Sequence, residues 1–282
     1  MTLDPRFATD ATSSRLCRLI FDSLVRFDEA FRPVPSLATW RRETPTRYVF
    51  ALRNDGQFHD GSPLTAADVV ATYRSILDPA TASPHRGSLS LIEKVYAIDE
   101  KNVAFELSRS DPLFPGLLTI GVLAKKQLAE KTNENSQVVG SGKFRVLGDW
   151  NDKRVSLERL SDGQEVHFET IRDPTVRALK LINNETDVLQ GGLAPEIVAW
   201  LGQKEGITSH RYAGTTFTYV GLNLRDPYLS QQKIREALAL AINREDIAKH
   251  LFAGRARLAN SIFTPEHWVY HDALSEISHN PD

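Results

Sequence analysis

The sequence predicts an α/β protein with more than one domain. Residues before about 165 are rich in strand and turn signals, whereas later residues alternate predicted strands with predicted helices. Hydrophobic residues make up 41% of the 282 positions, which is typical of a globular chain long enough for one large or two modest domains. We expect residues 1–21 and 156–265 to form one α/β domain, with residues 22–155 inserted as a smaller α+β domain.

The first half is predicted to hold two helices and several short strands. Leu16, Leu19 and Ile20 fall at helical spacing and predict a helix over 11–27. Thr65 begins a second helix, because Asp68 three residues later completes a capping box. Strands are expected at 48–53, at 92–107 as a pair around a turn at 99–102, and at 144–147, 155–160 and 166–171; residues 125–137 are expected to be a polar loop with a short helix.

The second half is predicted to alternate short strands with helices. Pro174 suits the first turn of a helix, and Gly254 suits the end of one. The expected helices are 174–183, 195–203, 231–241 and 246–252, the expected strands are 187–189 and 216–224, and residues after 264 are expected to form a loop.

Composition excludes several classes of function. Lys and Arg total 34 against 36 Asp and Glu, so the net charge is −2 and no basic excess predicts a nucleic-acid partner. No apolar run approaches the roughly 20 residues that cross a bilayer. The single cysteine, Cys17, cannot form an internal disulfide and is interpreted as a small core residue.

Two pairs of residues resemble fragments of catalytic or metal sites. Ser230 and Lys233 match the S-x-x-K pattern of serine acyl enzymes, but the K-T-G and S-D-N motifs that accompany it are absent, so a helix cap is favoured. His267 and His271 have the spacing of paired metal ligands, yet the expected loop and the lack of an evident third ligand favour surface histidines. We therefore expect no enzyme activity, no metal and no cofactor.

Two glycine-containing turns are also better explained by structure than by chemistry. Residues 140–143, Gly-Ser-Gly-Lys, lack the spacing of a phosphate-binding loop and are interpreted as a tight turn between strands. In residues 59–61, His-Asp-Gly, we expect Asp60 to accept hydrogen bonds from nearby backbone amides and Gly61 to adopt a positive φ.

Residues 58–70, FHDGSPLTAADVV, belong to a set of motifs that follow one another in a fixed order along the chain. This set resembles the extracellular solute-binding proteins of family 5, the oligopeptide and dipeptide binders of ABC importers, and residues 58–70 match the most distinctive motif of that family. Lys143, where the family usually has proline, and Asn183-Asn184, where a glycine often precedes the glutamate, depart from its pattern. The other matching segments are 3–5, 20–25, 35–40, 48–53, 78–84, 139–144, 185–188 and 234–244.

The resemblance implies a periplasmic-binding-protein-like lobe with an inserted smaller domain. Family members are usually nearly twice as long, so the second lobe is expected to be largely absent, with residues 266–282 as its start. The implied function is capture of oligopeptides or dipeptides in a cleft between lobes and delivery to ABC permease subunits. The implied location is the periplasm, or outside the membrane on a lipid anchor; residues 1–5 lack the features of a signal peptide, so a leader is not expected within this chain.

The resemblance also suggests which residues contact ligand: Thr9, Asp10 and Ala11 in one loop, His85 after Ser83-Pro84, and Tyr219 and Asn223 on a strand. Each also has an ordinary role, such as a helix N-cap for Asp10, a core position for Tyr219 and a surface loop for His85. Two alternatives stay open: the ligand-sensing domain of a regulator with the same fold, and a relative that binds nickel, haem or another small solute.

Overall fold

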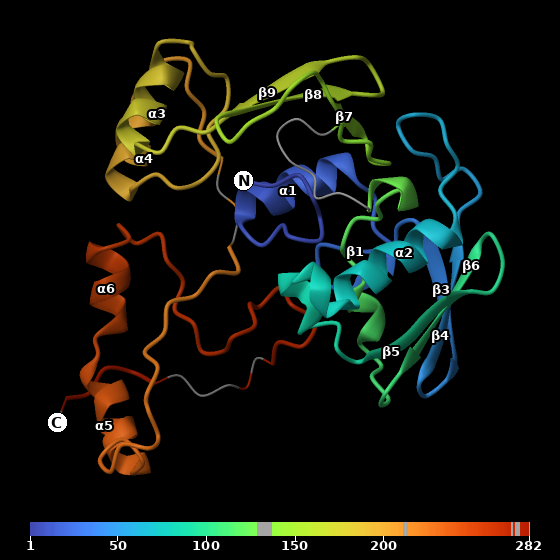
Figure 1. Ribbon diagram of the computed structural model, residues 1–282. Coiled ribbons are helices and arrows are strands. Elements are labelled where there is room, and N and C mark those ends of the chain that lie inside the picture. Colours follow the sequence, from blue (N-terminus) through green and yellow to red (C-terminus); the bar gives the residue numbers. More distant parts are fainter. Residues whose placement is uncertain (129–136, 211, 213, 272, 274–276, 282) are drawn as a thin grey trace. The chain divides into compact units, whose positions relative to one another are not determined.

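The chain divides into two compact units, and the computed structural model describes residues 1–128, 137–210, 212, 214–271, 273 and 277–281. The first unit is Met1–Thr170 and the second is Ile171–Asp282. Helices and strands occur together in the first unit, whereas the regular elements of the second are helices (Figure 1). Among the described residues, no helix is both long and apolar enough to cross a membrane.

A four-stranded antiparallel sheet organises the larger core of the first unit. Its order is β3 (Ala38–Thr44), β4 (Arg47–Leu52), β6 (Asn102–Leu107) and β5 (Ile92–Ala97). Helix α2 (Ala66–Leu77) packs on β5 and β6 (Figure 1). The rings of Tyr73 on α2 and of Phe50 both pack edge to face on the ring of Phe105, with ring centroids 5.4 Å apart in each pair. These fully buried aromatic rings hold the helix on the sheet.

A second core joins the N-terminus to a smaller sheet. Helix α1 (Ala11–Ile20) packs beside the antiparallel strands β7 (Phe144–Val146), β8 (Arg154–Arg159) and β9 (Glu165–Glu169). Leu3, Leu16 and Ile20 are buried with Val155 and Leu157. Cys17 lies in the same core, where burial raises the pKa of its thiol to about 12, so its interpretation as a core residue is confirmed.

The predicted helix over 11–27 is shorter than expected. It ends at Ile20, and Val25–Phe27 instead forms strand β1 against β2 (Pro33–Pro35). Ser141 and Gly142 donate their amides to the Ile20 carbonyl at 3.0 and 2.8 Å, in place of continuing helical bonds. The remaining short helices of this unit are η1 (Pro79–Thr81), η2 (Pro84–Arg86), η3 (Phe114–Leu117) and η4 (Lys125–Gln127); the rest of the loop expected over 125–137 lies mostly outside the described residues.

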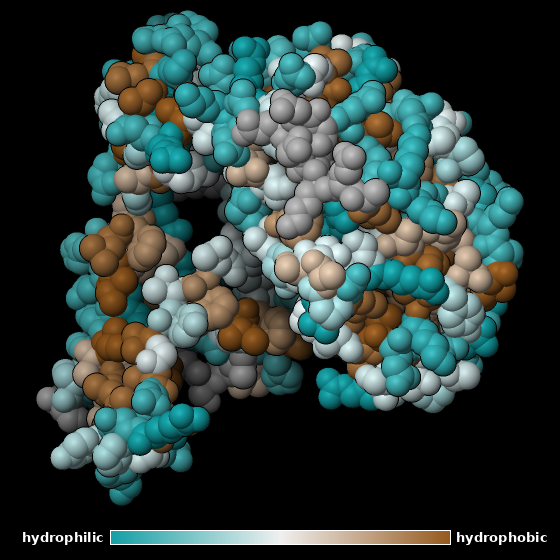
Figure 2. Space-filling view, viewed as in Figure 1, coloured by the Kyte–Doolittle hydropathy of each residue, from teal (hydrophilic) through white to brown (hydrophobic). Residues whose placement is uncertain are grey.

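The second unit contains α3 (Pro174–Ile182), α4 (Pro195–Leu201), α5 (Gln232–Ala241) and α6 (Arg244–His250). Helix α6 has Leu251 as its C-cap, so the sequence placed the end of this helix too late; Gly254, with φ +66, lies three residues further on and donates its amide to the Ala248 carbonyl inside the helix. The strands predicted over 187–189 and 216–224 are wrong, because both segments are irregular and unpaired. Of the described hydrophobic side chains in this unit, Ala178 and Leu201 are buried, while apolar side chains gather on the surface over α5 and α6 (Figure 2).

The division into 1–21 with 156–265 and an inserted 22–155 stays a prediction. In the first unit, the smaller core joins residues before Asp22 to β8 and also includes Leu123 and Val138, whereas the core built on the four-stranded sheet draws on residues from Leu24 to Val139.

The capping box of α2 supplies a stability test. The Asp68 carboxylate accepts the Thr65 amide at 2.9 Å, the Thr65 hydroxyl at 2.8 Å and the Lys125 amide at 2.8 Å. We expect Thr65→Ala to lower the free energy of unfolding by about 1 kcal/mol. Asp68→Ala should cost more, because it also leaves the Lys125 amide without its acceptor. Urea denaturation measures both, with Thr65→Ser as the control that keeps the hydroxyl; equal midpoints for all four proteins would contradict the cap.

Candidate functional site

Two of the segments expected to contact ligand lie together in the first unit. Asp10 is the N-cap of α1 and accepts the Ser13 amide at 2.9 Å, so its role as a helix cap is observed directly. The carbonyl of Ala8 accepts the Ser14 hydroxyl at 3.1 Å, which fixes the backbone before the helix. Thr9, Asp10 and Ala11 themselves are exposed. Residues 9–11 are therefore exposed to solvent, while hydrogen bonds to the first turn of α1 hold this segment in place.

His85 lies beside this loop. It is the middle residue of η2, and the Ser83 hydroxyl accepts its backbone amide at 3.3 Å. Burial lowers the pKa of the half-buried His85 imidazole, and the Ala8 carbonyl beside the ring opposes that shift. Its Nε2 is buried without a hydrogen-bond partner among the described residues. A buried polar atom with no protein partner marks a place where water or ligand completes the structure.

Tyr219 and Asn223 belong to the second unit, whereas residues 9–11 and His85 belong to the first. Tyr219 is 73% exposed and its ring lies 5.6 Å from that of Phe217. The Asn223 side chain accepts the Arg225 amide at 3.1 Å, which makes it part of a local turn. The expected core position for Tyr219 is therefore wrong for this chain, and its contact with ligand stays a prediction.

The two glycine-containing turns meet each other. Asp60 accepts both the amide and the hydroxyl of Ser62, and Gly61 has φ +83, as the sequence predicted for this turn. The His59 ring reaches residues 140–142: its Nδ1 accepts the Gly140 amide at 3.2 Å and its Nε2 donates to the Gly142 carbonyl at 2.9 Å. This pair of bonds assigns the neutral imidazole with its proton on Nε2.

The glycines of this turn are required by space. A Cβ at Gly140 would lie 1.9 Å from the Ile20 carbonyl oxygen, and one at Gly142 would lie 2.4 Å from the Leu19 carbonyl oxygen. Ser141 accepts the Asp22 amide at 3.1 Å. The Gly-Ser-Gly turn therefore packs directly against the last residues of α1. This close approach explains its two glycines without a phosphate ligand.

The remaining candidate residues make local contacts. The Ser230 hydroxyl donates to the Pro227 carbonyl at 3.0 Å, and α5 takes Gln231, not Ser230, as its N-cap, so the sequence placed that cap one residue early. His267 Nδ1 accepts the Val269 amide and His271 Nδ1 accepts the Ala273 amide, both at 3.1 Å. The described residues contain no group of three or more His, Cys, Asp and Glu side chains arranged to hold a metal ion.

The charged residues that support the candidate loop were not singled out from the sequence. Asp4 and Arg6 are buried and form an ion pair at 2.7 Å. The Ser83 hydroxyl donates to the Arg6 carbonyl at 2.7 Å. The one sequence signal was the short segment Leu3-Asp4-Pro5 at the start of the family resemblance, which marks the position but not its contacts.

Comparison with known proteins identifies the family. Residues 32–282 match the model of the bacterial extracellular solute-binding proteins, family 5 Middle. The chain belongs to this family. The α/β class and the likeness to one lobe of a periplasmic binding protein are also confirmed, because the oligopeptide-binding protein AppA of Bacillus subtilis, solved with a nonapeptide, superposes with a TM-score of 0.81 over 99% of the chain at 21% identity. The superposition covers 59% of that protein.

Two curated relatives come from Escherichia coli. The periplasmic oligopeptide-binding protein OppA is 24% identical over 89% of this chain and 52% of its own length. The dipeptide-binding protein is 25% identical over 93% of this chain and 56% of its own length. The chain therefore spans about half the length of the curated relatives it matches.

The His59 contacts predict a pH dependence of stability. Burial lowers the pKa of His59, as does Arg145, while the Gly142 carbonyl and the carboxylates of Asp22 and Asp60 raise it. Because the folded pKa lies below the unfolded value of about 6.5, the contribution of the neutral ring is present above about pH 6.5 and lost as the pH falls toward the folded pKa. Urea midpoints at about pH 7.5 and 5 should therefore diverge more in the wild type than in His59→Gln.

His85 adds to the same trend, so the comparison must be made between variants. His210→Gln, at an exposed position, is the control and should keep the wild-type pH dependence. If His59→Gln lost as much stability between the two pH values as the wild type, the assigned neutral tautomer would be wrong.

Proposed function

We propose that the chain is the ligand-binding part of a peptide-type ABC importer, and that it captures oligopeptides or dipeptides. The observation that carries this proposal is the family match over residues 32–282. The names of the relatives agree with it, since OppA is an oligopeptide-binding protein and its Escherichia coli counterpart a dipeptide-binding protein. Both are binding proteins, which supports a carrier over an enzyme.

Residues 9–11 and His85 are the proposed contact surface of the first unit. Peptides are recognised largely through main-chain hydrogen bonds, and this surface offers three exposed residues next to a polar imidazole. Nε2 of His85 would gain the partner that it lacks. Tyr219 and Asn223 are proposed as contacts from the second unit, on the strength of the family resemblance alone.

Delivery to membrane permease subunits and a location in the periplasm, or outside the membrane on a lipid anchor, belong to the same proposal. They rest on the family and on the word periplasmic in the name of OppA. The alternatives of a regulatory sensor and of a nickel or haem carrier gain no support from the described contacts. Peptide is therefore the ligand to test first.

Isothermal titration with a mixed library of di- to pentapeptides tests the proposal. We expect saturable binding weaker than about 100 μM, because a ligand held on one side leaves much of its surface in water and must still offset the entropy of association. His85→Ala should weaken it further, whereas His250→Ala should not. No saturable heat at millimolar peptide would contradict peptide binding, and micromolar or tighter affinity would show that these 282 residues hold a complete site.

A further inference from the structure

A buried ion pair lies next to the proposed contact surface. The Asp4 and Arg6 side chains are 1% and 4% exposed, and Arg6 Nη2 lies 2.7 Å from Asp4 Oδ2. Arg6 Nε donates to Asp4 Oδ1 at 3.0 Å, and the Arg6 amide donates to the same oxygen at 3.0 Å. Removing two charges from water offsets much of their attraction, so apolar residues of similar volume often serve stability as well or better. The pair therefore calls for a role besides stability.

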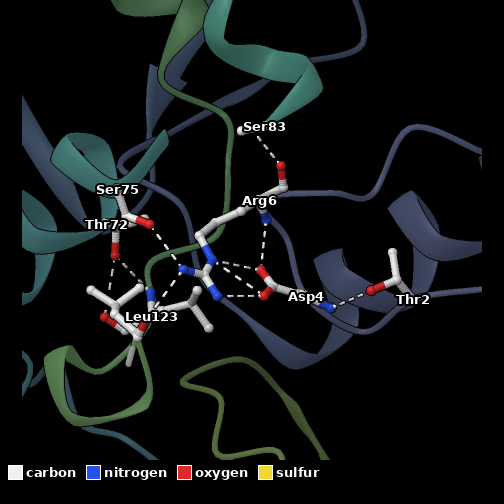
Figure 3. Close-up of polar contacts among 8 residues, drawn as sticks. Thr2, Asp4, Arg6, Thr72, Ser75, Ser83 and Leu123 are labelled. Carbon is white, nitrogen blue, oxygen red and sulfur yellow. Dashed lines mark hydrogen bonds and ion pairs between the residues drawn. The ribbon is translucent and has the colours of Figure 1, made fainter. Parts of the chain in front are cut away.

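Arg6 connects the N-terminal segment to two other parts of the first unit. Its Nη1 donates to the Ser75 hydroxyl on α2 at 2.8 Å, and its carbonyl accepts the Ser83 hydroxyl at 2.7 Å. Figure 3 shows the guanidinium between the Asp4 carboxylate and Ser75, with Ser83 reaching the Arg6 carbonyl from the other side. The guanidinium is planar with fixed donor directions, so these bonds define the orientation of the chain at Arg6.

The Ser83 hydroxyl couples this network to His85. It is buried, and it donates to the Arg6 carbonyl while accepting the His85 amide at 3.3 Å. Two residues after Arg6, the Ala8 carbonyl lies against the His85 ring. One hydroxyl group thus links Arg6, which precedes the exposed residues 9–11, to His85.

We propose that the buried Asp4–Arg6 pair and Ser83 are positioning residues, which hold residues 9–11 and His85 in the conformation that a peptide recognises. This inference rests on the proposed function and names the buried residues that hold its contact surface in place. All three residues are buried beneath that surface. They act by fixing the backbone on both sides of the contact surface, as supporting residues do beneath a preorganised site.

The test compares Ser83→Ala with Ser23→Ala in the full chain. Ser23 also donates its hydroxyl to a backbone carbonyl, that of Val25 at 2.8 Å, but it contacts neither segment of the proposed surface. The imidazole of His85 is titrated by NMR, with its signals assigned from His85→Gln. Ser83→Ala should move the pKa of His85 up toward about 6.5, because the ring loses its buried position. Ser23→Ala should leave the pKa of His85 unchanged, even if this variant loses as much melting temperature as Ser83→Ala.

Peptide binding is measured on the same samples by NMR with alanine tripeptide, Ala-Ala-Ala. Ser83→Ala should raise Kd about tenfold, a loss of about 1.4 kcal/mol, and Ser23→Ala should leave Kd within about twofold. An unchanged His85 pKa or an unchanged Kd in Ser83→Ala would overturn the positioning role. If the wild type shows no peptide-induced shifts, the proposed function fails, and an unchanged His85 titration in Ser83→Ala would still overturn the positioning role by itself.

A second variant separates positioning from stability. Asp4→Leu combined with Arg6→Met replaces the ion pair by apolar side chains and should fold with a melting temperature close to that of the wild type. It should nevertheless shift the His85 titration in the same direction as Ser83→Ala. A stable double variant with a wild-type His85 titration would show that the pair serves stability alone.

Discussion

The orientation of the N-terminal segment in the first unit depends on a charged pair that is buried beside the N-terminus. An ionised side chain in a protein core must keep its partners, because losing one leaves an unpaired charge without water. Asp4 and Arg6 meet this condition through each other and through Ser75 of α2. The exposed residues 9–11 are therefore held on both sides. Ser83 bonds the Arg6 carbonyl before them, and Asp10 caps α1 after them.

Local interactions explain which parts of this unit could be predicted from sequence. The capping box at Thr65 and the turn at Asp60 involve residues within three positions of each other, so their patterns carry their geometry. The end of α1 could not be predicted in this way, because the groups that meet the Ile20 carbonyl come from residues 141 and 142. The same holds for the candidate site: Asp10 and His85 were named separately, whereas the link through Arg6 and Ser83 spans 77 positions.

The second unit shows the limit of pattern-based prediction of strands. Residues 216–224 have the composition of a strand, but a strand is stable when its backbone is paired and its apolar face is covered. Neither condition is met here: no described strand of this unit offers a partner, and Tyr219, Val220 and Leu224 are at least 60% exposed. The helices of this unit were predicted closely, because their hydrogen bonds are internal and need no distant partner.

The peptide-contacting surface proposed for the first unit consists of residues 9–11 and His85. Photo-crosslinking tests it most directly: a short peptide carrying a benzophenone side chain is irradiated with the full chain, and the attachment sites are mapped by mass spectrometry. Attachment within residues 9–11 and 83–88, competed by unlabelled peptide of the same sequence, is the predicted result. Competable attachment confined to other residues of the first unit, such as the outer face of the four-stranded sheet, would contradict the account.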